Sequence, residues 1–370
     1  MPLVAHNALP TFERLRAEGT AVLPPNRAAQ QDIRELHVGL LNMMPDAALA
    51  ATERQFFRLV GESNPIAQFY VHPFTLPELP RGPRAREHIE RYYESFEGVR
   101  EQGLDALIVT GANVSGPELA DQPFWEPLIG VIDWAMENVT SILCSCLATH
   151  ALLQFRYGQK RAPQARKIWG VFPHRVVDKR HPLVNDVNTR FDVPHSRWNA
   201  VSREQFDQAG LHVLVESEQV GVHLATSEDG LRVVFFQGHP EYDTISLLKE
   251  YKREVTLWAG GQRADYPPFP DNYFGIREKA LLNEYRGRLE AARDAGRPLP
   301  EFPERLLVER LDNTWHDTAE AVVGNWMGLV YQVTHRDRRI PFMEGVDPDD
   351  PLGLYGGGGP SRNPPPHRGA

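Results

Sequence analysis

The sequence predicts an α/β fold in which a doubly wound, mostly parallel sheet is flanked by helices. Two observations lead to this prediction. Short apolar runs typical of buried strands alternate with amphipathic stretches of helical period through the first half of the chain. Glycine or proline closes many of these segments, as expected where the chain turns between layers. Sheets of this kind bind ligands at the carboxyl ends of their strands, so functional residues are expected there.

The first half of the chain supplies four expected strands, each followed by a helix. The run LHVGLLNM predicts a strand at 36–43, and Leu49, Phe56 and Val60 fall on one helical stripe in the segment that follows. The same alternation predicts further strands at 66–71, 106–110 and 140–145, and helices at 84–96, 123–138 and 147–157. The carboxyl ends of these strands should therefore meet at one edge of the sheet.

From about residue 168 the pattern changes to successive strand-like runs. Glu228-Asp229-Gly230 is a hairpin-type turn signal between two of them. The strands are expected at 171–177, 211–216, 221–226 and 231–237, and helices at 244–259, 276–295 and 315–333. This half of the chain should add strands to the sheet and cover it with further helices.

Four segments are expected along the chain. They are an N-terminal extension at 1–35, an α/β domain with the functional residues at 36–275, a C-terminal helical region at 276–345 and a tail at 346–370. The last twenty residues contain 6 glycines and 5 prolines, a composition that cannot build a packed core. The tail is therefore expected to be disordered.

Charge and composition exclude several classes of protein. The net charge of −9 argues against a general binder of nucleic acid or of anionic membranes. No apolar run approaches the roughly 18 residues of a membrane-spanning helix, and the first residues lack the pattern of a signal peptide. The two cysteines, Cys144 and Cys146, are one residue apart, a spacing that rarely permits an unstrained disulfide. We therefore expect a cytoplasmic protein.

The segment around Cys146 carries the strongest chemical signal. Cys146 lies between the strand at 140–145 and the helix at 147–157. A nucleophile at such a turn points into the cleft above the sheet, and the helix amino end lowers the pKa of a thiol. The alternative for a single free cysteine is a buried structural role, which suits Cys144 inside the strand better.

A histidine and a carboxylate follow another expected strand. His239 and Glu241 come directly after the run VVFF and flank Pro240. A histidine at a strand end can act as a general base, and a nearby carboxylate can orient its ring. On their own these residues are a weak signal, and a structural histidine is the default interpretation. Together with Cys146 on the same sheet they predict a catalytic group.

Other candidates lie in loops and on helices. The turn after the strand at 106–110 contains Gly111 and Ala112, whose backbone N–H groups could hold an oxyanion together with that of Leu147. Ser196 and Arg197 form a polar cluster that could bind a substrate hydroxyl or carboxylate. The spacing of the fourteen histidines indicates no metal centre, and no phosphate-binding or dinucleotide motif is present.

The chain resembles the homoserine O-succinyltransferase family, acyltransferases of methionine biosynthesis with a flavodoxin-like fold related to class I glutamine amidotransferases. The resemblance runs from Ile33 to Phe274 and resumes from Asn325 to Thr334. It rests on the stretches IRELHVGLLNMMP, ATERQFFRLVG, GLDALIVTGA, NVTSILCSCLATHALLQFRYG, DVPHSRW, FFQGHPEYD and PDNYF. The family resemblance also implies a homodimer, and it implies no cofactor beyond the acyl donor, succinyl-CoA.

Roles for individual residues follow from this resemblance. It implies that Cys146 is the acyl-thioester nucleophile, that His239 is the proton acceptor and that Glu241 is its partner. Three further residues match substrate-contacting positions, namely Lys167, Ser196 and Arg253. The expected reaction transfers a succinyl group to the hydroxyl of L-homoserine by a ping-pong mechanism.

The resemblance places Ser115 at the position linked to the choice of acyl donor. Family members commonly carry glycine or glutamate there, and a small residue leaves room for succinyl, whereas glutamate would repel its carboxylate. Succinyl-CoA is therefore expected, with acetyl-CoA as the alternative. Two other functions remain open from the residues, namely a glutaminase or peptidase using Cys146, His239 and Glu241, and a redox sensor that needs only the cysteine.

Overall fold

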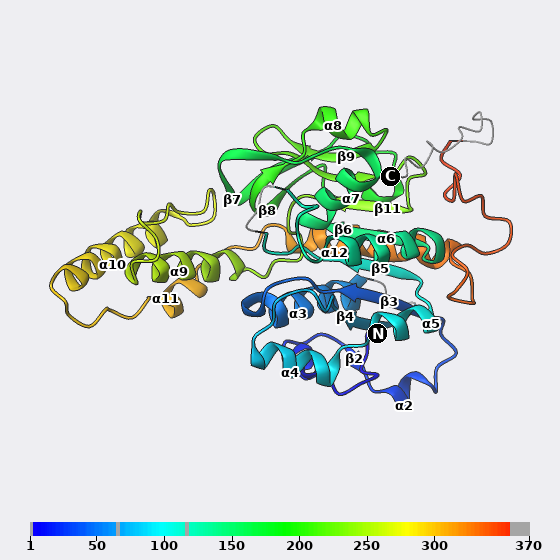
Figure 1. The fold of residues 1–370 in the computed structure, drawn as a ribbon, viewed down its shortest axis with the longest axis horizontal. Helices are drawn as coiled ribbons and strands as arrows, with labels where there is room; N and C mark the ends of the chain where they lie inside the picture. Colours follow the sequence, from blue (N-terminus) through cyan, green and yellow to red (C-terminus); the bar gives the residue numbers. More distant parts are fainter. Residues whose placement is uncertain (1–2, 64–66, 115–117, 356–370) are drawn as a thin grey trace.

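The computed structural model describes residues 3–63, 67–114 and 118–355. It confirms the α/β prediction, since one eleven-stranded sheet with the order β2-β1-β4-β3-β5-β6-β11-β10-β9-β7-β8 is flanked by helices (Figure 1). The strands are β1 (Leu3–Val4), β2 (Val22–Leu23), β3 (Glu35–Leu41), β4 (Gln68–Phe74), β5 (Ala106–Val109), β6 (Ser141–Ser145), β7 (Ala162–Val176), β8 (Arg190–Ala200), β9 (His212–Ser217), β10 (Gly221–Thr226) and β11 (Val233–Phe236).

The helices lie between these strands in the chain and after them. They are α1 (Pro10–Ala17), α2 (Pro25–Ala28), α3 (Asp46–Ser63), α4 (Pro83–Tyr92), α5 (Phe96–Gln102), α6 (Trp125–Asn138), α7 (Leu147–Tyr157), the 3₁₀ helix η1 (Pro182–Val184), α8 (Arg203–Gln208), α9 (Ser246–Ala259), α10 (Ile276–Asp294), α11 (Glu304–Val308) and α12 (His316–Val333). None of the described helices combines the length and the apolar character that crossing a bilayer requires.

The sheet has a parallel half and an antiparallel half. Every pairing from β2 through β11 in the sheet order is parallel, whereas β10, β9, β7 and β8 pair antiparallel. The parallel register sets Ser145 at the end of β6 opposite Phe236 at the end of β11. The two segments that follow these strands therefore leave the sheet side by side.

Alternation along the central strands buries both faces of the sheet. In β5, Ala106 and Ile108 join a core with side chains of α3 and α12, whereas Leu107 and Val109 join a core with α6 and α7. A strand covered on both faces has a continuous run of apolar residues. This is why these strands were recognisable in the sequence.

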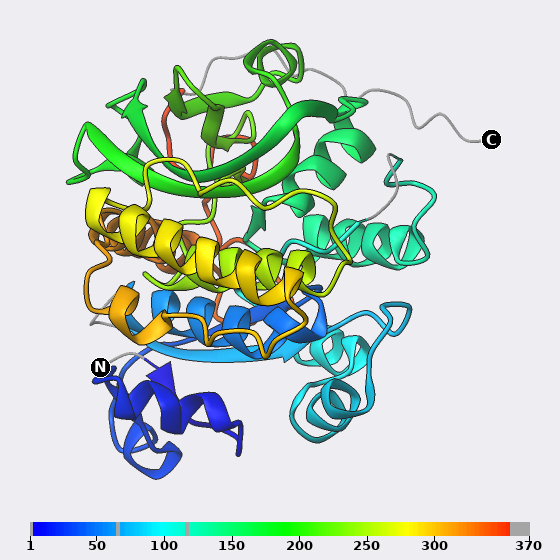
Figure 2. The same cartoon turned by 90° about the vertical axis from the view of Figure 1, so that its left-hand side faces the viewer.

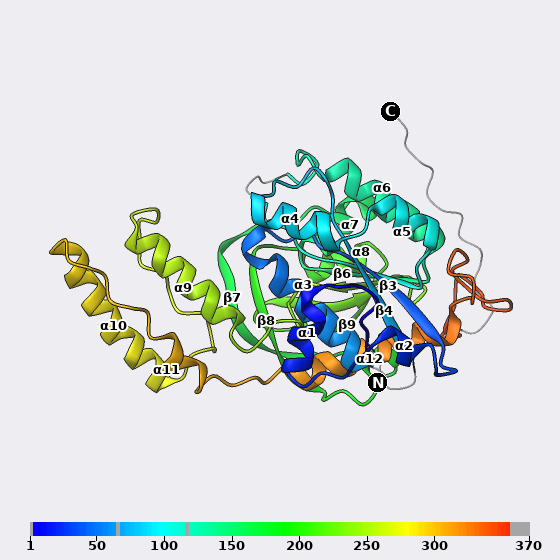
Figure 3. The ribbon, with the colours of Figure 1, turned by 90° about the horizontal axis from the view of Figure 1, so that it is seen from below.

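The α9, α10 and α11 group stands at one end of the molecule, beyond β7 and β8 (Figures 1 and 3). Figure 2 looks onto this end and shows α10 lying across it. These helices share a separate apolar core with β7, formed by Trp169, Val171, Tyr251, Trp258, Leu282, Tyr285, Leu289 and Leu307. The backbone of Asp271 also bonds to β7, where Val171 N–H donates to its carbonyl at 2.9 Å.

The structure differs from the sequence prediction at both ends and in several internal segments. The N-terminal extension adds β1 and β2 to the sheet, and β8 occupies a segment for which no strand was expected. The helix expected at 84–96 is two helices, because the Glu94 N–H leaves the helical path to donate to Pro73 O, and Ser95 caps α5. Residues 346–355 are folded, since Val346 and Leu352 pack against the main core.

Candidate active site

The backbone at Cys146 turns sharply between β6 and α7. Cys146 has φ 53° and ψ −105°, a left-handed conformation that a non-glycine residue adopts only under strain. Its N–H donates to Phe236 O at 2.7 Å, so the turn is bonded to the end of the neighbouring strand. Thr149 Oγ1 donates to the same carbonyl at 2.8 Å. The side chain of Cys146 is partly exposed, whereas that of Cys144 is fully buried in the core.

His239 and Glu241 follow the adjacent strand and lie beside Cys146. The His239 N–H donates to Pro194 O at 2.8 Å, which fixes the backbone after β11. His239 Nδ1 lies 2.8 Å from Glu241 Oε1, and both side chains are buried. The side chains of His239 and Cys146 also face each other, since each shifts the pKa of the other. The structure therefore brings the predicted Cys146, His239 and Glu241 together in one group.

The electrostatics of this group favour a thiolate facing a charged imidazole. Burial acts to raise the pKa of the Cys146 thiol, but the charge of His239 and its hydrogen bond outweigh burial and lower that pKa. The pKa of His239 lies well above its ordinary value, since the Cys146 thiolate and Glu241 outweigh the opposing effect of burial. The pair can therefore exist as thiolate and imidazolium at neutral pH.

Arg197 adds a second positive charge near the thiol. Its guanidinium is buried, and it donates to Val220 O at 2.6 Å, to Asn199 O at 3.2 Å and to His195 Nδ1 at 3.3 Å. In the described part of the chain no carboxylate pairs with it. Burial lowers the pKa of Arg197 to about 10, which leaves it charged at neutral pH, and this charge also lowers the pKa of Cys146.

The expected backbone donors lie next to Cys146. A β-carbon placed on Gly111 would be 3.8 Å from Cys146 Cβ and 3.9 Å from Leu147 N, so the loop after β5 approaches the start of α7. The Leu147 N–H is the first of a helix, where amide groups lack partners within the helix. Ala112 is partly buried against the same core. These N–H groups can donate to the carbonyl oxygen of an acyl group bonded to Cys146 Sγ.

A partly buried carboxylate, Glu250, gathers two of the predicted substrate residues. Ser196 Oγ donates to Glu250 Oε2 at 2.6 Å, and Lys167 Nζ lies 3.1 Å from the same oxygen. Tyr242 Oη donates to Glu250 Oε1 at 2.9 Å, and the Tyr242 ring stacks on His239 with centroids 4.4 Å apart. Burial acts to raise the pKa of Glu250, but Lys167 and these hydrogen bonds lower it, so Glu250 is charged.

Two other predicted residues are not part of this cluster. Arg253 is on α9 one turn after Glu250, but its side chain is 54% exposed and pairs with Glu254 at 3.2 Å. It lines an open groove of about 450 Å³ with Lys249, Lys252, Thr256, Leu257 and Glu304. Among the described residues no hydrogen bond or ion pair joins Arg253 to Lys167 or Ser196. Ser115 lies outside the described residues.

Glu250 and Tyr242 were not predicted from the sequence, and the environment predicted for Arg197 was wrong. Arg197 was taken for a polar loop residue, yet β8 alternates and points His195 and Arg197 inward while Ser196 faces Glu250. The inward charge of Arg197 could not be inferred without that strand. Glu250 has one signal in the sequence, its position three residues before Arg253 on an expected helix.

Comparisons of the sequence with known proteins agree on one family. A family model described as homoserine O-succinyltransferase matches residues 2–336. The chain is similar to proteins named homoserine O-succinyltransferase from Allochromatium vinosum, at 71% identity over 96% of this chain and 99% of the relative, and from Nitrosococcus oceani, at 66% identity over the same shares. A protein of that name from Cardiobacterium hominis is 51% identical over 95% of this chain and 99% of its own length.

Solved structures give weaker matches. A glutamine amidotransferase from Thermotoga maritima aligns with a TM-score of 0.42 and 11% identity, covering 80% of this chain and 97% of that protein. A glutamine amidotransferase from Methylobacillus flagellatus aligns with a TM-score of 0.42 and 14% identity, covering 80% of this chain and 95% of that protein.

Proposed function

The chain belongs to the homoserine O-succinyltransferase family, and from this premise we propose that it transfers a succinyl group from succinyl-CoA to the side-chain hydroxyl of L-homoserine through an acyl-thioester on Cys146. The observation that carries this proposal is the strained turn at Cys146 beside the hydrogen-bonded pair of His239 and Glu241. A thiolate, an imidazole and an orienting carboxylate are the groups that covalent acyl transfer requires.

The first half-reaction acylates the enzyme. The Cys146 thiolate attacks the thioester carbonyl, and the oxygen becomes negatively charged as the new S–C bond forms. The N–H groups of Leu147, Gly111 and Ala112 stabilise that oxygen. Collapse of the tetrahedral intermediate breaks the bond to the CoA sulfur, which takes the proton from the His239 imidazolium. Free CoA leaves, and His239 is now neutral.

The second half-reaction transfers the acyl group. Neutral His239 accepts the proton of the homoserine hydroxyl as its oxygen attacks the acyl-thioester. The S–C bond then breaks, O-succinyl-L-homoserine forms, and the Cys146 thiolate again faces a charged imidazole. Glu241 stabilises this charge and keeps Nδ1 of the ring protonated, so that the opposite ring nitrogen serves both half-reactions.

Lys167 and Ser196 are proposed to bind the substrate next to His239. Both are held by Glu250, which in turn is bonded to Tyr242, whose ring stacks on the imidazole. The Lys167 ammonium has further N–H donors that can recognise a carboxylate of the substrate. Ser196 Oγ gives its hydrogen to Glu250, so it can accept a hydrogen bond from a donor group of the substrate. Glu250 acts through these neighbours as a positioning residue. Arg253 is proposed to contribute at the mouth of the site, because its side chain is exposed one helical turn away.

Succinyl-CoA is proposed as the donor because the loop after Gly111 carries Ser115 where a glutamate would exclude a second carboxylate. The test is a side-by-side assay of succinyl-CoA and acetyl-CoA with homoserine, and of glutamine as an alternative substrate. Succinyl-CoA should give the larger kcat/KM, and glutamine should release no ammonia. A preference for acetyl-CoA would mean that acetyl-CoA is the donor. Hydrolysis of glutamine would mean that the protein is a glutaminase and not an acyltransferase.

Matched cysteine variants separate the two thiols in the same assay. Cys146→Ala should lose activity by about a thousandfold or more, because the covalent route disappears. Cys144→Ala should keep most of its activity, since that thiol is enclosed in the core. The opposite ranking would assign the reaction to Cys144.

A further inference from the structure

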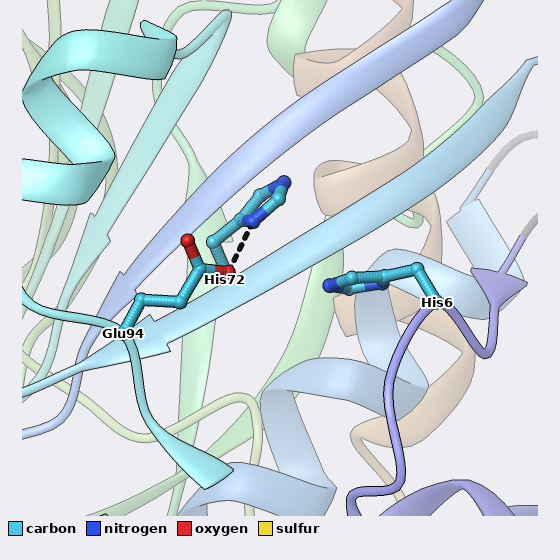
Figure 4. A group of neighbouring side chains, drawn as sticks. All are labelled: His6, His72 and Glu94. Atoms are coloured by element: carbon cyan, nitrogen blue, oxygen red, sulfur yellow. Dashed lines mark hydrogen bonds and ion pairs between the residues drawn. The ribbon is translucent and has the colours of Figure 1, made fainter.

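Three potential metal ligands meet at the edge of the sheet formed by the N-terminal segment. Leu3 of β1 pairs in parallel register with Phe69 of β4, so His6 and His72, each three residues further on, become neighbours. Glu94 joins them because its residue forms a bridge with Phe74 at the end of β4. One ligand atom from each of His6, His72 and Glu94 lies within 4.8 Å of the other two (Figure 4).

The hydrogen bonds around the two imidazoles leave suitable lone pairs. His6 Nδ1 lies 3.2 Å from Val4 O and donates to it, so His6 Nε2 carries a lone pair, to which Asn7 Nδ2 donates at 3.5 Å and which a metal ion would take over. His72 Nδ1 lies 2.6 Å from Glu94 Oε1, and His72 Nε2 lies 2.9 Å from His37 Nδ1. A metal-bound histidine commonly donates its second N–H to a neighbour, and both His6 and His72 have that partner in place.

The charges of the three residues fit a divalent cation. Glu94 is partly exposed and supplies a carboxylate oxygen. His6 is also partly exposed, and its ring supplies a nitrogen donor, as does the ring of His72. Two imidazoles and one carboxylate, with a position open to water, form a donor set typical of zinc and related first-row ions.

We propose that His6, His72 and Glu94 bind a divalent transition-metal ion of the zinc type, with water completing the coordination. The ion takes the place of the proton between His72 and Glu94, and the separation of Nδ1 and Oε1 widens from 2.6 Å to about 3.3 Å, as tetrahedral bonds of about 2 Å require. His72 then carries its proton on Nε2, which donates to His37 Nδ1. His37 in turn carries its proton on Nε2, which lies 3.5 Å from Glu35. The proton that the ion displaces from His72 Nδ1 is thus retained on this pair of rings.

Such an ion would join the N-terminal segment to the sheet. His6 is in the loop after β1, His72 is in β4, and Glu94 lies between α4 and α5. In the sheet, β3 and β5 separate β4 from β6, the strand that leads to Cys146. The proposed site is therefore structural and independent of the proposed transfer reaction. The distances of 66 and 22 positions between the ligands explain why sequence spacing indicated no metal centre.

The experiment is zinc and cobalt binding to the full chain after treatment with a chelator. One zinc ion per chain should bind, and cobalt should give the visible absorption of a site with nitrogen and oxygen ligands. His6→Ala and Glu94→Gln should each weaken zinc binding at least about tenfold. Zinc should also raise the melting temperature of the unchanged chain but not that of His6→Ala.

A second group provides the control. Glu62, His316 and Glu320 also approach within 4.8 Å of one another, but all three are partly exposed on α3 and α12. His316→Ala should leave zinc binding unchanged. The proposal is overturned if the chain binds no zinc, if His6→Ala and Glu94→Gln bind it like the unchanged chain while remaining folded, or if His316→Ala alone abolishes binding.

Discussion

At the residue scale, the reactivity of Cys146 depends on two positive charges. His239 contributes the larger effect, by charge and by hydrogen bond, and buried Arg197 contributes a smaller one. Cys144 is two residues away, yet burial raises the pKa of its thiol. The difference between two thiols in one turn therefore arises from position relative to the sheet, because one lies within the strand and the other just beyond its end.

The lowered pKa of Cys146 predicts fast alkylation below the titration range of an ordinary thiol. The rate at which iodoacetamide alkylates an ordinary cysteine falls below the usual thiol pKa of about 8.5. The alkylation rate of Cys146 should begin to fall only well below that pH. His239→Asn should reduce the rate at neutral pH by about tenfold, because the thiolate loses its charged partner. Arg197→Met should give a smaller reduction, and Arg197→Lys should restore the rate. A rate profile that none of these substitutions moves would contradict the assignment.

The contacts of Glu250 predict that its substitution weakens the use of homoserine but not that of the acyl donor. Glu250→Gln removes the charge opposite Lys167 and weakens the bonds from Ser196 and Tyr242. The KM for homoserine should rise about tenfold, whereas the rate of CoA release in the absence of homoserine should change little. Measuring the two half-reactions separately decides the point. A loss restricted to the acylation half-reaction would place Glu250 with the donor.

At the element scale, the site is assembled where β6 and β11 end together. The segment after β11 passes very close to β8, and this close approach sets the position of His239. A β-carbon on Gly238 would lie 2.6 Å from Val193 Cγ1 and 2.9 Å from the His195 ring, contacts that real side chains do not make. Glycine at this position therefore allows His239 to follow the strand directly.

Gly238→Ala should reduce activity at least about tenfold by displacing His239, and it should lower the melting temperature. Gly287 on α10 provides the control, because a β-carbon there meets nothing within 4 Å and the residue is exposed. Gly287→Ala should be neutral or stabilise the protein by about 0.5–1 kcal/mol. Equal effects of the two substitutions on activity would contradict the role of the close approach.

The sequence revealed the elements whose signal is local and missed those that depend on distant partners. The parallel strands and α7 were recognisable because apolar period and a closing glycine suffice to identify them. β8 was missed, since two of its inward residues are polar: His195 bonds to His174 at 3.2 Å, and Arg197 to backbone carbonyls. Cys146, His239 and Glu241 could be singled out as strand-end residues, whereas the role of Glu250 depends on three partners that only the fold brings together.

At the scale of the whole molecule, α12 returns the chain to the sheet that carries the site. Trp326 is fully buried, and its Nε1–H donates to Ser141 Oγ at 2.7 Å at the start of β6. The helix packs on α3 in the same core. The C-terminal region therefore supports the strand that ends at Cys146, although it lies 180 positions later in the chain, from 146 to 326.

Trp326→Ala should lower the free energy of unfolding by about 3–5 kcal/mol, because it removes a large buried ring and leaves Ser141 without that donor. Trp198, which is 57% exposed, is the matched control, and Trp198→Ala should change stability by less than about 0.5 kcal/mol. Urea denaturation measures both values. A small effect at Trp326 would mean that α12 is not required for the stability of the sheet.

In the proposed mechanism the enzyme carries the acyl group on Cys146 between its two substrates. The most direct measurement is the mass of the protein and of its peptides after incubation with succinyl-CoA in the absence of homoserine. We predict a single added succinyl group, located on the peptide at Cys146 and removed when homoserine is supplied. A protein of unchanged mass that still forms product, or a succinyl group located on another residue, would contradict the account.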